Sequence, residues 1–182
     1  FGDPADPVLL LVNGLGSQSV NYWVDWCEQF AAAGFRVIRF DNRDVGRSTG
    51  FDEAGITLAY TLDDMAGDAV AVLDAVGVER AHVLGLSMGG MVGQHLGIRH
   101  ADRFHCLVLV STSSAPAAQG TAIWEERIRI AGTQGMAPVV DGAMARWVAA
   151  DAMANNPALV TRLRRMILAT PPAGYVGWCQ AI

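Results

Sequence analysis

Residues 81–90 read Ala-His-Val-Leu-Gly-Leu-Ser-Met-Gly-Gly, and this stretch decides how the rest of the chain is interpreted. It joins a short apolar run to the pattern Gly-x-Ser-x-Gly, with Ser87 at the centre. The run predicts a strand over 81–86, and the residues after it predict a helix over 88–100. The pattern therefore falls where a buried strand meets a helix, which is the context that a strained, accessible serine needs.

Ser87 is the candidate nucleophile of the chain. The turn around it is tight, so the positions on either side must lack bulk, and Gly85 and Gly89 meet that requirement. The turn lifts the serine hydroxyl clear of the sheet, at the helix N-terminus, where the helix dipole favours negative charge. The alternative is a glycine-rich turn in which the serine is incidental.

A second motif, Asn-Gly-Leu-Gly at 13–16, follows a continuous apolar run at 8–12. Acyl transfer passes through a tetrahedral intermediate whose oxyanion needs two N–H donors. One donor is expected from Met88, the residue after the nucleophile, and the other from the loop after the strand at 8–12. We predict Leu15 as that second donor, because the glycines beside it let the backbone turn inward. A plain turn between a strand and a helix is the alternative.

Strand and helix patterns alternate through the first 114 residues. Strands are predicted at 8–12, 35–40, 81–86 and 104–110, and helices at about 20–33, 62–76 and 88–100. This alternation predicts an α/β fold, a mostly parallel sheet with helices on both faces. From about residue 121 to 182 only helical spacing is found, with breaks at 155–157 and 170–172, so a separate helical layer is expected.

Composition narrows the function classes. Of the 182 residues, 52% are hydrophobic and 17% are charged, which fits a packed core, and the net charge of −5 comes without any Lys/Arg run that would favour nucleic acid. The three cysteines lie far apart and form no metal motif, so no cofactor or metal is implied and we expect Cys27, Cys106 and Cys179 to be buried. No signal peptide or membrane-spanning run is visible, so a cytoplasmic location is expected.

The chain resembles the α/β-hydrolase superfamily, in particular its small members that carry a cap. Three segments match family motifs in the expected order: the stretch around Ser87, the turn at 13–16, and Arg-Phe-Asp-Asn-Arg-Asp-Val-Gly-Arg-Ser at 39–48. The last of these resembles aclacinomycin methylesterase-like esterases. The tail resembles the cap of 3-oxoadipate enol-lactonases, at Gly135-Met136, Arg146-Trp147, Thr170, Gly174-Tyr175 and 179–182. Asn13 stands where the family usually has a loop-supporting His.

The resemblance implies a division of the chain into two parts. Residues 1–114 correspond to the hydrolase core with its first strands missing, and 115–182 correspond to the helical cap, with the C-terminal catalytic part of the core absent. In the resembling families the catalytic acid and His follow the cap, so here they are expected beyond Ile182. We therefore expect a fragment with little or no turnover by itself and an unpaired apolar edge beside the fourth strand.

The four histidines of the chain agree with this expectation, because none is placed to serve as the base. His82 starts the strand that delivers Ser87, about 16 Å away at ~3.3 Å per residue. His95 lies about 12 Å down the helix axis, and His100 lies farther still. His105 begins its strand, at the end of the sheet opposite the site of a parallel fold.

The resulting hypothesis is a serine hydrolase that acts on a carboxylic ester or lactone through an acyl-enzyme on Ser87, with a small-molecule substrate and no nucleic-acid or membrane partner. Trp124 and Trp147, together with Trp178, are candidate substrate contacts in the cap. The charged segment at 41–47 is expected to pair internally and fix its loop. An enol-lactonase would need a cation for its substrate carboxylate, for which the candidates are Arg127, Arg129 and Arg146.

The sequence is compatible with two other functions. It is also compatible with a homo-oligomer. The first is a cofactor-free perhydrolase or haloperoxidase-type activity at the same serine, because a fold does not fix a reaction. The second is a non-catalytic binding module on a hydrolase scaffold, against which the intact glycine pair argues, since binding does not require a strained serine.

Overall fold

Four parallel strands form the sheet at the centre of the molecule, of which the computed structural model describes residues 1–51, 59–115 and 120–182. In sequence order they are β1 (Val8–Val12), β2 (Arg36–Arg39), β3 (Ala81–Leu86) and β4 (Phe104–Val110). Their order across the sheet is β2-β1-β3-β4. All five residues of β1 are buried, as a strand covered on both faces requires, and the predicted parallel sheet is confirmed.

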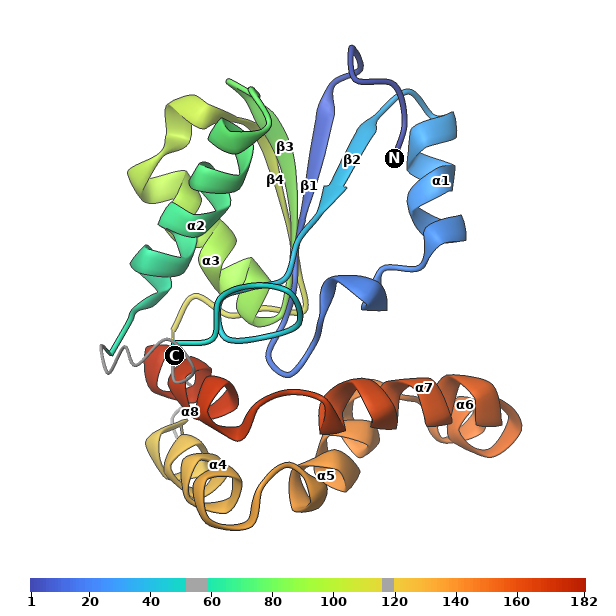
Figure 1. Ribbon diagram of the computed structural model, residues 1–182, viewed down its shortest axis with the longest axis vertical. Coiled ribbons are helices and arrows are strands. Elements are labelled where there is room, and N and C mark those ends of the chain that lie inside the picture. Colours follow the sequence, from blue (N-terminus) through green and yellow to red (C-terminus); the bar gives the residue numbers. More distant parts are fainter. Residues whose placement is uncertain (52–58, 116–119) are drawn as a thin grey trace.

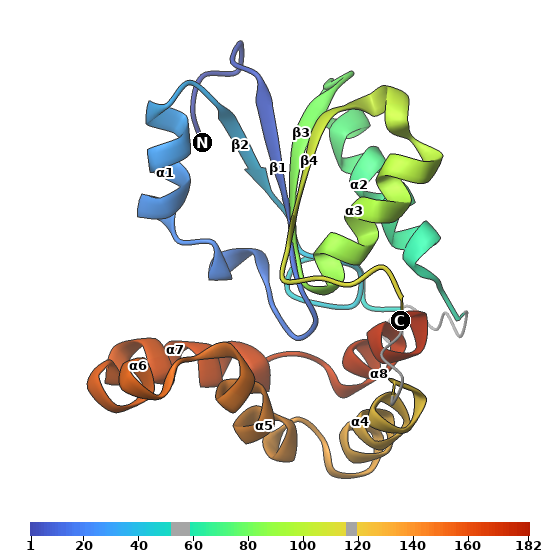
Figure 2. The ribbon, with the colours of Figure 1, turned by 180° about the vertical axis from the view of Figure 1, so that it is seen from behind.

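Helices cover both faces of the sheet. Helix α1 (Val24–Ala32) lies on one face, and α2 (Leu62–Ala75) and α3 (Met88–Arg99) lie on the other, as Figures 1 and 2 show from opposite sides. The 3₁₀ turns η1 (Ser19–Asn21) and η2 (Ala101–Arg103) precede α1 and β4. The larger core lies between the sheet and α2 and α3, and the α1 face has a smaller core of its own.

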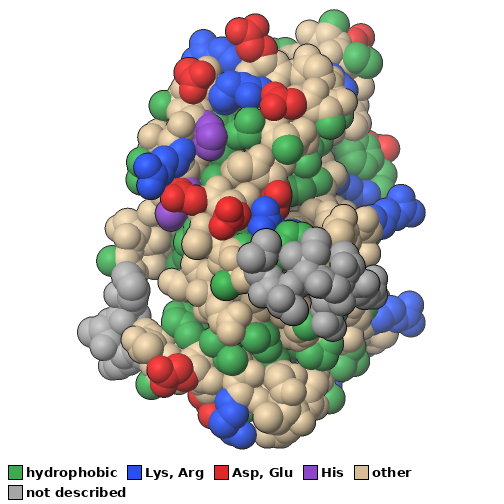
Figure 3. All heavy atoms as spheres, turned by 60° about the vertical axis from the view of Figure 1, so that its left-hand side comes forward, with side chains coloured by type: hydrophobic (Ala, Val, Ile, Leu, Met, Phe, Trp, Pro, Cys, Tyr) green, Lys and Arg blue, Asp and Glu red, His purple; other side chains and the backbone are tan. Residues whose placement is uncertain are grey.

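Ion pairs hold the outer faces of α2 and α3 together. The Asp63 carboxylate on α2 lies 2.5 Å from His95 Nδ1 and 3.2 Å from an Arg99 nitrogen, both on α3. Figure 3 shows acidic, basic and histidine side chains interspersed over this part of the surface. These contacts join α2 to α3, the helix that begins directly after Ser87.

The predicted helix at 20–33 begins later than its apolar spacing indicated. Gln18 and Trp23 are extended, the short turn η1 lies between them, and α1 starts only at Val24. Asp41 causes part of this delay, because its carboxylate accepts a 2.6 Å hydrogen bond from the Ser19 backbone N–H. Trp23, directly before α1, is 47% exposed.

The helical layer predicted after residue 120 is present. It consists of α4 (Gly120–Gln134), α5 (Ala137–Trp147), α6 (Ala150–Asn155), α7 (Pro157–Leu168) and α8 (Pro172–Ala181). The layer lies across the carboxyl ends of the strands (Figure 1) and has its own buried cluster, which includes Met144 and Ile167. The two predicted breaks coincide with Pro157 and Pro172, each at the first position of a helix. A division into core and cap at residues 114 and 115 remains our proposal.

Strand β4 is the outermost strand on its side of the described sheet, as expected from the sequence. Val108 and Leu109 are 44% and 41% exposed, so the edge is apolar as well as unpaired within the described residues. The same exposure corrects the expectation for the cysteines. Cys27 and Cys179 are buried, whereas Cys106 is exposed because it lies on this strand.

We expect the 182-residue chain to self-associate at high concentration, because an exposed apolar edge strand is a template for pairing. Val108→Lys places a charge on that edge and should shift the population toward monomer in sedimentation-velocity experiments. Ile98→Lys is the matched control, since Ile98 is 74% exposed but lies on α3. Equal association of the two variants would contradict a role for the β4 edge.

Candidate active site

Ser87 occupies a strained turn between the last residue of β3 and the first residue of α3. Its φ is 55° and its ψ is −117°, a combination that a residue with a side chain rarely adopts, and its side chain is exposed. Backbone hydrogen bonds hold this conformation: Ser87 N–H donates to Val110 at 2.8 Å, and Ser87 C=O accepts from Gly90 at 2.9 Å. Strain of this kind persists only where the surroundings over-determine it.

Close backbone packing surrounds the turn. A Cβ added at Gly85 would overlap the Gly89 carbonyl oxygen, and one added at Gly89 would overlap the carbonyl oxygen of Val12 on β1. At Gly90 an added Cβ would come within 2.6 Å of the Thr112 Cβ, in the loop after β4. The glycines therefore let the first turn of α3 lie directly against two strands and fix where the serine points.

The glycine-rich turn after β1 lies directly beside the serine. A Cβ at Gly14 would be 3.2 Å from the Ser87 Cβ, and Gly16 has a φ of +72°, a conformation that favours glycine. Leu15, between them, is partly buried and packs against both the main core and the cap cluster. Neither the Leu15 N–H nor the Met88 N–H donates to a backbone acceptor among the described residues.

Asn13 holds this turn in place with its whole amide group. Its Nδ2 donates to the Phe40 carbonyl at 3.0 Å, and its Oδ1 accepts from the Ser17 hydroxyl at 3.2 Å. Its own carbonyl accepts a 3.1 Å hydrogen bond from Asn42 Nδ2. Asn13, Ser17 and Asn42 are all buried, so this network is protected from water. The Asn13 amide thus supports the loop, which is the role expected of the His that the resembling family usually has at this position.

The charged segment at 41–47 is engaged internally, as the sequence indicated. The Asp41 carboxylate accepts from the Ser19 and Arg47 backbone N–H groups at 2.6 and 3.0 Å. Arg43 forms a 2.6 Å ion pair with Asp68 on α2. The segment therefore links the turn after β1 to α2 and is not free to bind a substrate through these groups.

The four histidines have structural partners or lie away from the turn. His95 is paired with Asp63, and this hydrogen bond is the main reason that the pKa of Asp63 lies below its usual value. His82 packs between the rings of Phe35 and His105, with centroid distances of 5.7 and 5.2 Å. No histidine hydrogen-bonds to Ser87 within the described ranges, so these contain no base in direct contact with the serine.

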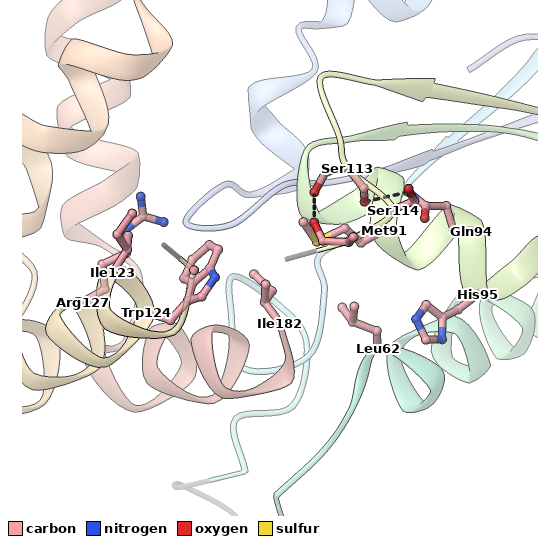
Figure 4. A pocket seen from close by; sticks show the side chains of 12 residues that line it. Leu62, Met91, Gln94, His95, Ser113, Ser114, Ile123, Trp124, Arg127 and Ile182 are labelled. Carbon is pink, nitrogen blue, oxygen red and sulfur yellow. Dashed lines mark hydrogen bonds between the residues drawn. The ribbon is translucent and has the colours of Figure 1, made fainter. Parts of the chain in front are cut away.

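A cavity of about 360 Å³ lies between the core and the cap (Figure 4). Met91, in the first turn of α3, lines it and donates its N–H to the Ser87 carbonyl, so the cavity begins one helical turn from the serine. The cavity combines an apolar lining with a few polar groups, as ligand sites do. Its lining includes the side chains of Leu62, Met91, Gln94, His95, Trp124, Arg127 and Ile182.

The contribution of α3 to this lining was not expected from the sequence. Met91 and His95 follow Ser87 at intervals of four residues, so helical spacing would place all three on one face. This spacing is the signal in the sequence that would place His95 in the wall of a pocket beside the serine. Ser113 and Ser114 also line the cavity, and no local pattern indicates this.

The three candidate tryptophans of the cap occupy different places. Trp124 lines the cavity. Trp147 is 40% exposed and lies over the turn after β1, with its ring 3.5 Å from the position that a Cβ at Gly16 would take. Trp178 is fully buried and donates from Nε1 to the Arg43 carbonyl at 3.0 Å, so its predicted place in the lining is wrong. Substrate contact by Trp124 and Trp147 stays a prediction.

The candidate cations differ in the same way. Arg129 forms a 2.7 Å ion pair with Glu126 one turn earlier on α4, which occupies its guanidinium. Arg127 lines the cavity with its Cζ 4.4 Å from the Trp124 ring centroid, and no carboxylate of the described residues pairs with it. Burial, followed by the charge of Arg127, lowers the pKa of Arg146.

A strained serine between a strand and a helix is typical of α/β-hydrolase folds, as are the glycine-rich turn beside it and the helical layer across the carboxyl ends of the strands. The chain belongs to the alpha/beta hydrolase fold family, which its residues 7–174 match. Both resemblances noted in the sequence have counterparts among known proteins.

Among curated proteins, rhodomycin D methylesterase from Streptomyces sp. strain C5 is 46% identical over 111 residues, which is 60% of this chain and 36% of that protein. The 3-oxoadipate enol-lactonase 2 of Acinetobacter baylyi is 30% identical over 182 residues, 100% of this chain and 65% of that protein. The chain thus spans less than two thirds of either relative.

Among solved structures, the enol-lactonase of Burkholderia xenovorans LB400 superposes with a TM-score of 0.88 at 31% identity. The match covers 100% of this chain and 67% of that one. None of the helices in the described part of the chain combines the length and apolarity needed to cross a bilayer. Nor do the described residues gather three His, Cys, Asp or Glu side chains where they could hold a metal.

We expect Gly85→Ala to destabilise the chain by about 3 kcal/mol, because the new methyl group meets backbone that cannot move aside. Gly67→Ala is the matched control, since Gly67 is an exposed position in α2 with open space around it. That change should stabilise by about 0.5–1 kcal/mol through helix propensity. Urea unfolding measures both, and equal unfolding midpoints would contradict the close packing around Ser87.

Proposed function

We propose that the complete protein is a serine hydrolase that cleaves a carboxylic ester or lactone through an acyl-enzyme on Ser87. The observation that carries this proposal is the strained, exposed serine next to two backbone N–H groups that lack backbone acceptors in the described chain. In a binding module the strain at φ 55° would bring no advantage, whereas a nucleophile gains access and orientation from it.

The proposed reaction begins with attack of the Ser87 hydroxyl oxygen on the acyl carbon, while a base takes the hydroxyl proton. The carbonyl oxygen becomes an oxyanion, which Leu15 and Met88 stabilise with their N–H groups. Collapse of the intermediate releases an alcohol, or opens the ring of a lactone, and leaves an acyl-enzyme that water hydrolyses. We assign the base and its orienting acid to residues that follow Ile182 in the complete protein, because no described histidine contacts the serine.

The relatives support this reaction class. One is named as a methylesterase and the other as an enol-lactonase, and both names describe cleavage of an acyl–oxygen bond. A methyl ester and a cyclic enol ester differ in leaving group but pass through the same kind of tetrahedral intermediate. The perhydrolase alternative shares the acyl-enzyme, so the two differ in whether water or hydrogen peroxide accepts the acyl group.

Ser87→Ala in the complete protein should abolish hydrolysis of p-nitrophenyl acetate, with a loss of at least about 10³-fold in kcat/KM. A fluorophosphonate probe should label the wild-type protein at Ser87, as peptide mass spectrometry would show. Failure of that serine to react would leave a binding module as the better interpretation. Peracid formation faster than ester hydrolysis would favour the perhydrolase.

The 182-residue chain provides the control for the missing partners. It should hydrolyse the same ester no faster than its own Ser87→Ala variant, because the proposed base and acid are not among its residues. Robust Ser87-dependent turnover by this chain would contradict the assignment of the base beyond Ile182.

The cavity supports a finer proposal, a substrate that carries a carboxylate. Arg127 lines the cavity, is oriented by the Trp124 ring and has no carboxylate partner in the described residues. The charge of Arg127 also contributes to the lowered pKa of Arg146. A bound anion would offset these positive charges, and a partly buried guanidinium recognises a carboxylate well.

Arg127→Met should lower kcat/KM for the mono-p-nitrophenyl ester of glutaric acid by about 10- to 100-fold, because the substrate carboxylate loses one hydrogen bond to a charged donor. Hydrolysis of p-nitrophenyl valerate, which has a methyl group in place of the carboxylate, should change by less than about 2-fold. Arg129→Met is the matched control, because Arg129 lies two residues away and is paired with Glu126. An equal loss on both esters would refute the anion subsite.

A further inference from the structure

The cavity between the core and the cap has a histidine in its core wall. His95 lies on α3 about two turns after Ser87, a separation of about 12 Å along the helix axis. Figure 4 shows its ring beside Leu62 of α2, across the cavity from Arg127 of α4. The cavity therefore extends from the first turn of α3, at Met91, to a polar side chain well away from the serine.

Asp63 on α2 fixes the orientation of this ring. Its carboxylate lies 2.5 Å from His95 Nδ1 and 3.2 Å from an Arg99 nitrogen. The hydrogen bond with His95 is the main reason that the pKa of Asp63 lies below its usual value, so the carboxylate is ionised at neutral pH. An ionised carboxylate only accepts hydrogen bonds, so Nδ1 carries the hydrogen and donates it to Asp63.

The Asp63 carboxylate has a well-defined position, because it lies in the first turn of a capped helix. At the start of α2 the Thr61 hydroxyl accepts from the Asp64 N–H at 3.3 Å, and the Asp64 carboxylate accepts from the Thr61 N–H at 2.7 Å. Asp63 lies between these residues, where the helix dipole favours a negative charge. Leu62, directly before it, lines the cavity. One turn of α2 thus supplies an apolar part of the wall and the anchor of the His95 ring.

The second ring nitrogen, Nε2, is the group with which His95 can bind a ligand. The side chain has one hydrogen bond within the described residues, through Nδ1, so Nε2 has no protein partner there. In the neutral ring Nε2 accepts a hydrogen bond, and in the charged ring it donates one. A hydroxyl group suits both forms, because it can donate and accept. A carboxylate suits this end of the cavity less well, since the negative charge of Asp63 lies against the same ring.

Two other polar side chains of the lining are bonded within their own wall of the cavity. Gln94 Nε2 donates to the Ser113 carbonyl at 2.9 Å, and the Ser113 hydroxyl donates to the Ala115 carbonyl at 3.1 Å. On the opposite wall, Arg127 is the cation to which we assign the substrate carboxylate. His95 therefore gives the core wall a hydrogen-bonding group whose chemistry differs from that of the guanidinium.

We propose that His95 is a substrate-binding residue whose Nε2 forms a hydrogen bond with a hydroxyl group of the substrate. This role rests on the proposed serine-hydrolase function and narrows the substrate class to esters or lactones that carry a hydroxyl group at a distance from the acyl carbon. When Ser87 attacks that carbon, the intervening chain lies along Met91, and the hydroxyl group reaches His95 about two turns farther along α3.

The test compares two p-nitrophenyl esters in the complete protein, the ω-hydroxyoctanoate and the nonanoate, which has a methyl group in place of the hydroxyl. His95→Phe should lower the ratio of kcat/KM for the hydroxy ester to that for the nonanoate by roughly 3- to 10-fold, because one hydrogen bond to the substrate is lost. The loss should appear mainly as a higher KM for the hydroxy ester, since the contact is made in the ground state as well as in the transition state.

His100→Phe is the matched control, because it makes the same substitution at the C-cap of α3, outside the described lining of the cavity. It should keep the wild-type ratio. If circular dichroism shows that His95→Phe is unfolded, His95→Leu takes its place. A folded variant with an unchanged ratio would overturn the proposal, and so would a protein that reacts with the fluorophosphonate probe at Ser87 but hydrolyses neither long-chain ester. A wild-type protein that resists the probe would instead refute the hydrolase function itself.

Discussion

The approach of the Gly89 carbonyl to the Cα of Gly85 is the contact on which the rest of the site depends. It lets helix α3 begin immediately after β3, with a single residue between them in a conformation that side chains rarely adopt. That residue then stands at the helix N-terminus, where an oxyanion is stabilised by the dipole and by free N–H groups. A methyl group on either glycine would push the helix away and tilt the serine with it.

The polar segment after β2 organises the other half of the site. Buried Asn42 and Asn13 hold the turn with Leu15, Asp41 holds the start of η1, and Arg43 reaches both α2 and, through its carbonyl, Trp178 of the cap. One loop thereby links the turn after β1, the core helix α2 and the last cap helix α8 to one another. Buried polar groups stabilise the fold only when each has a hydrogen-bond partner, and in this loop those partners are other groups of the protein.

Local patterns predicted most of the core, because its elements obey local rules. β3 and β4 have the predicted bounds, and α2 and α3 end within one residue of them, since apolar periodicity and glycine stops act over a few residues. The start of α1 was missed because a distant carboxylate, Asp41, captures the Ser19 N–H, and no local pattern reports such a bond.

The cap illustrates the same limit for the site. Its helices and their proline breaks were predictable, but which tryptophan faces the cavity was not. Trp124, Trp147 and Trp178 look alike in sequence and lie in the cavity, over a turn and in the core, respectively. Their places depend on how α4, α5 and α8 dock on the sheet, which is a tertiary property. Likewise, Arg127 lines the cavity whereas Arg129 is paired with Glu126, and no local sequence pattern distinguishes the two.

The unequal attachment of the cap helices has a consequence for how such a protein can diversify. Trp178 of helix α8 donates to the Arg43 carbonyl of the core, whereas α5 packs mainly on its cap neighbours α4 and α7. A protein engineer can therefore exchange the segment from α4 to α7 while α8 stays with the host, with the junction in the Thr170–Pro171 linker. The exchanged segment would have to reproduce the contacts of α7 with the core, where the Met166 carbonyl accepts from Gln18 and Arg162 donates to the Val20 carbonyl.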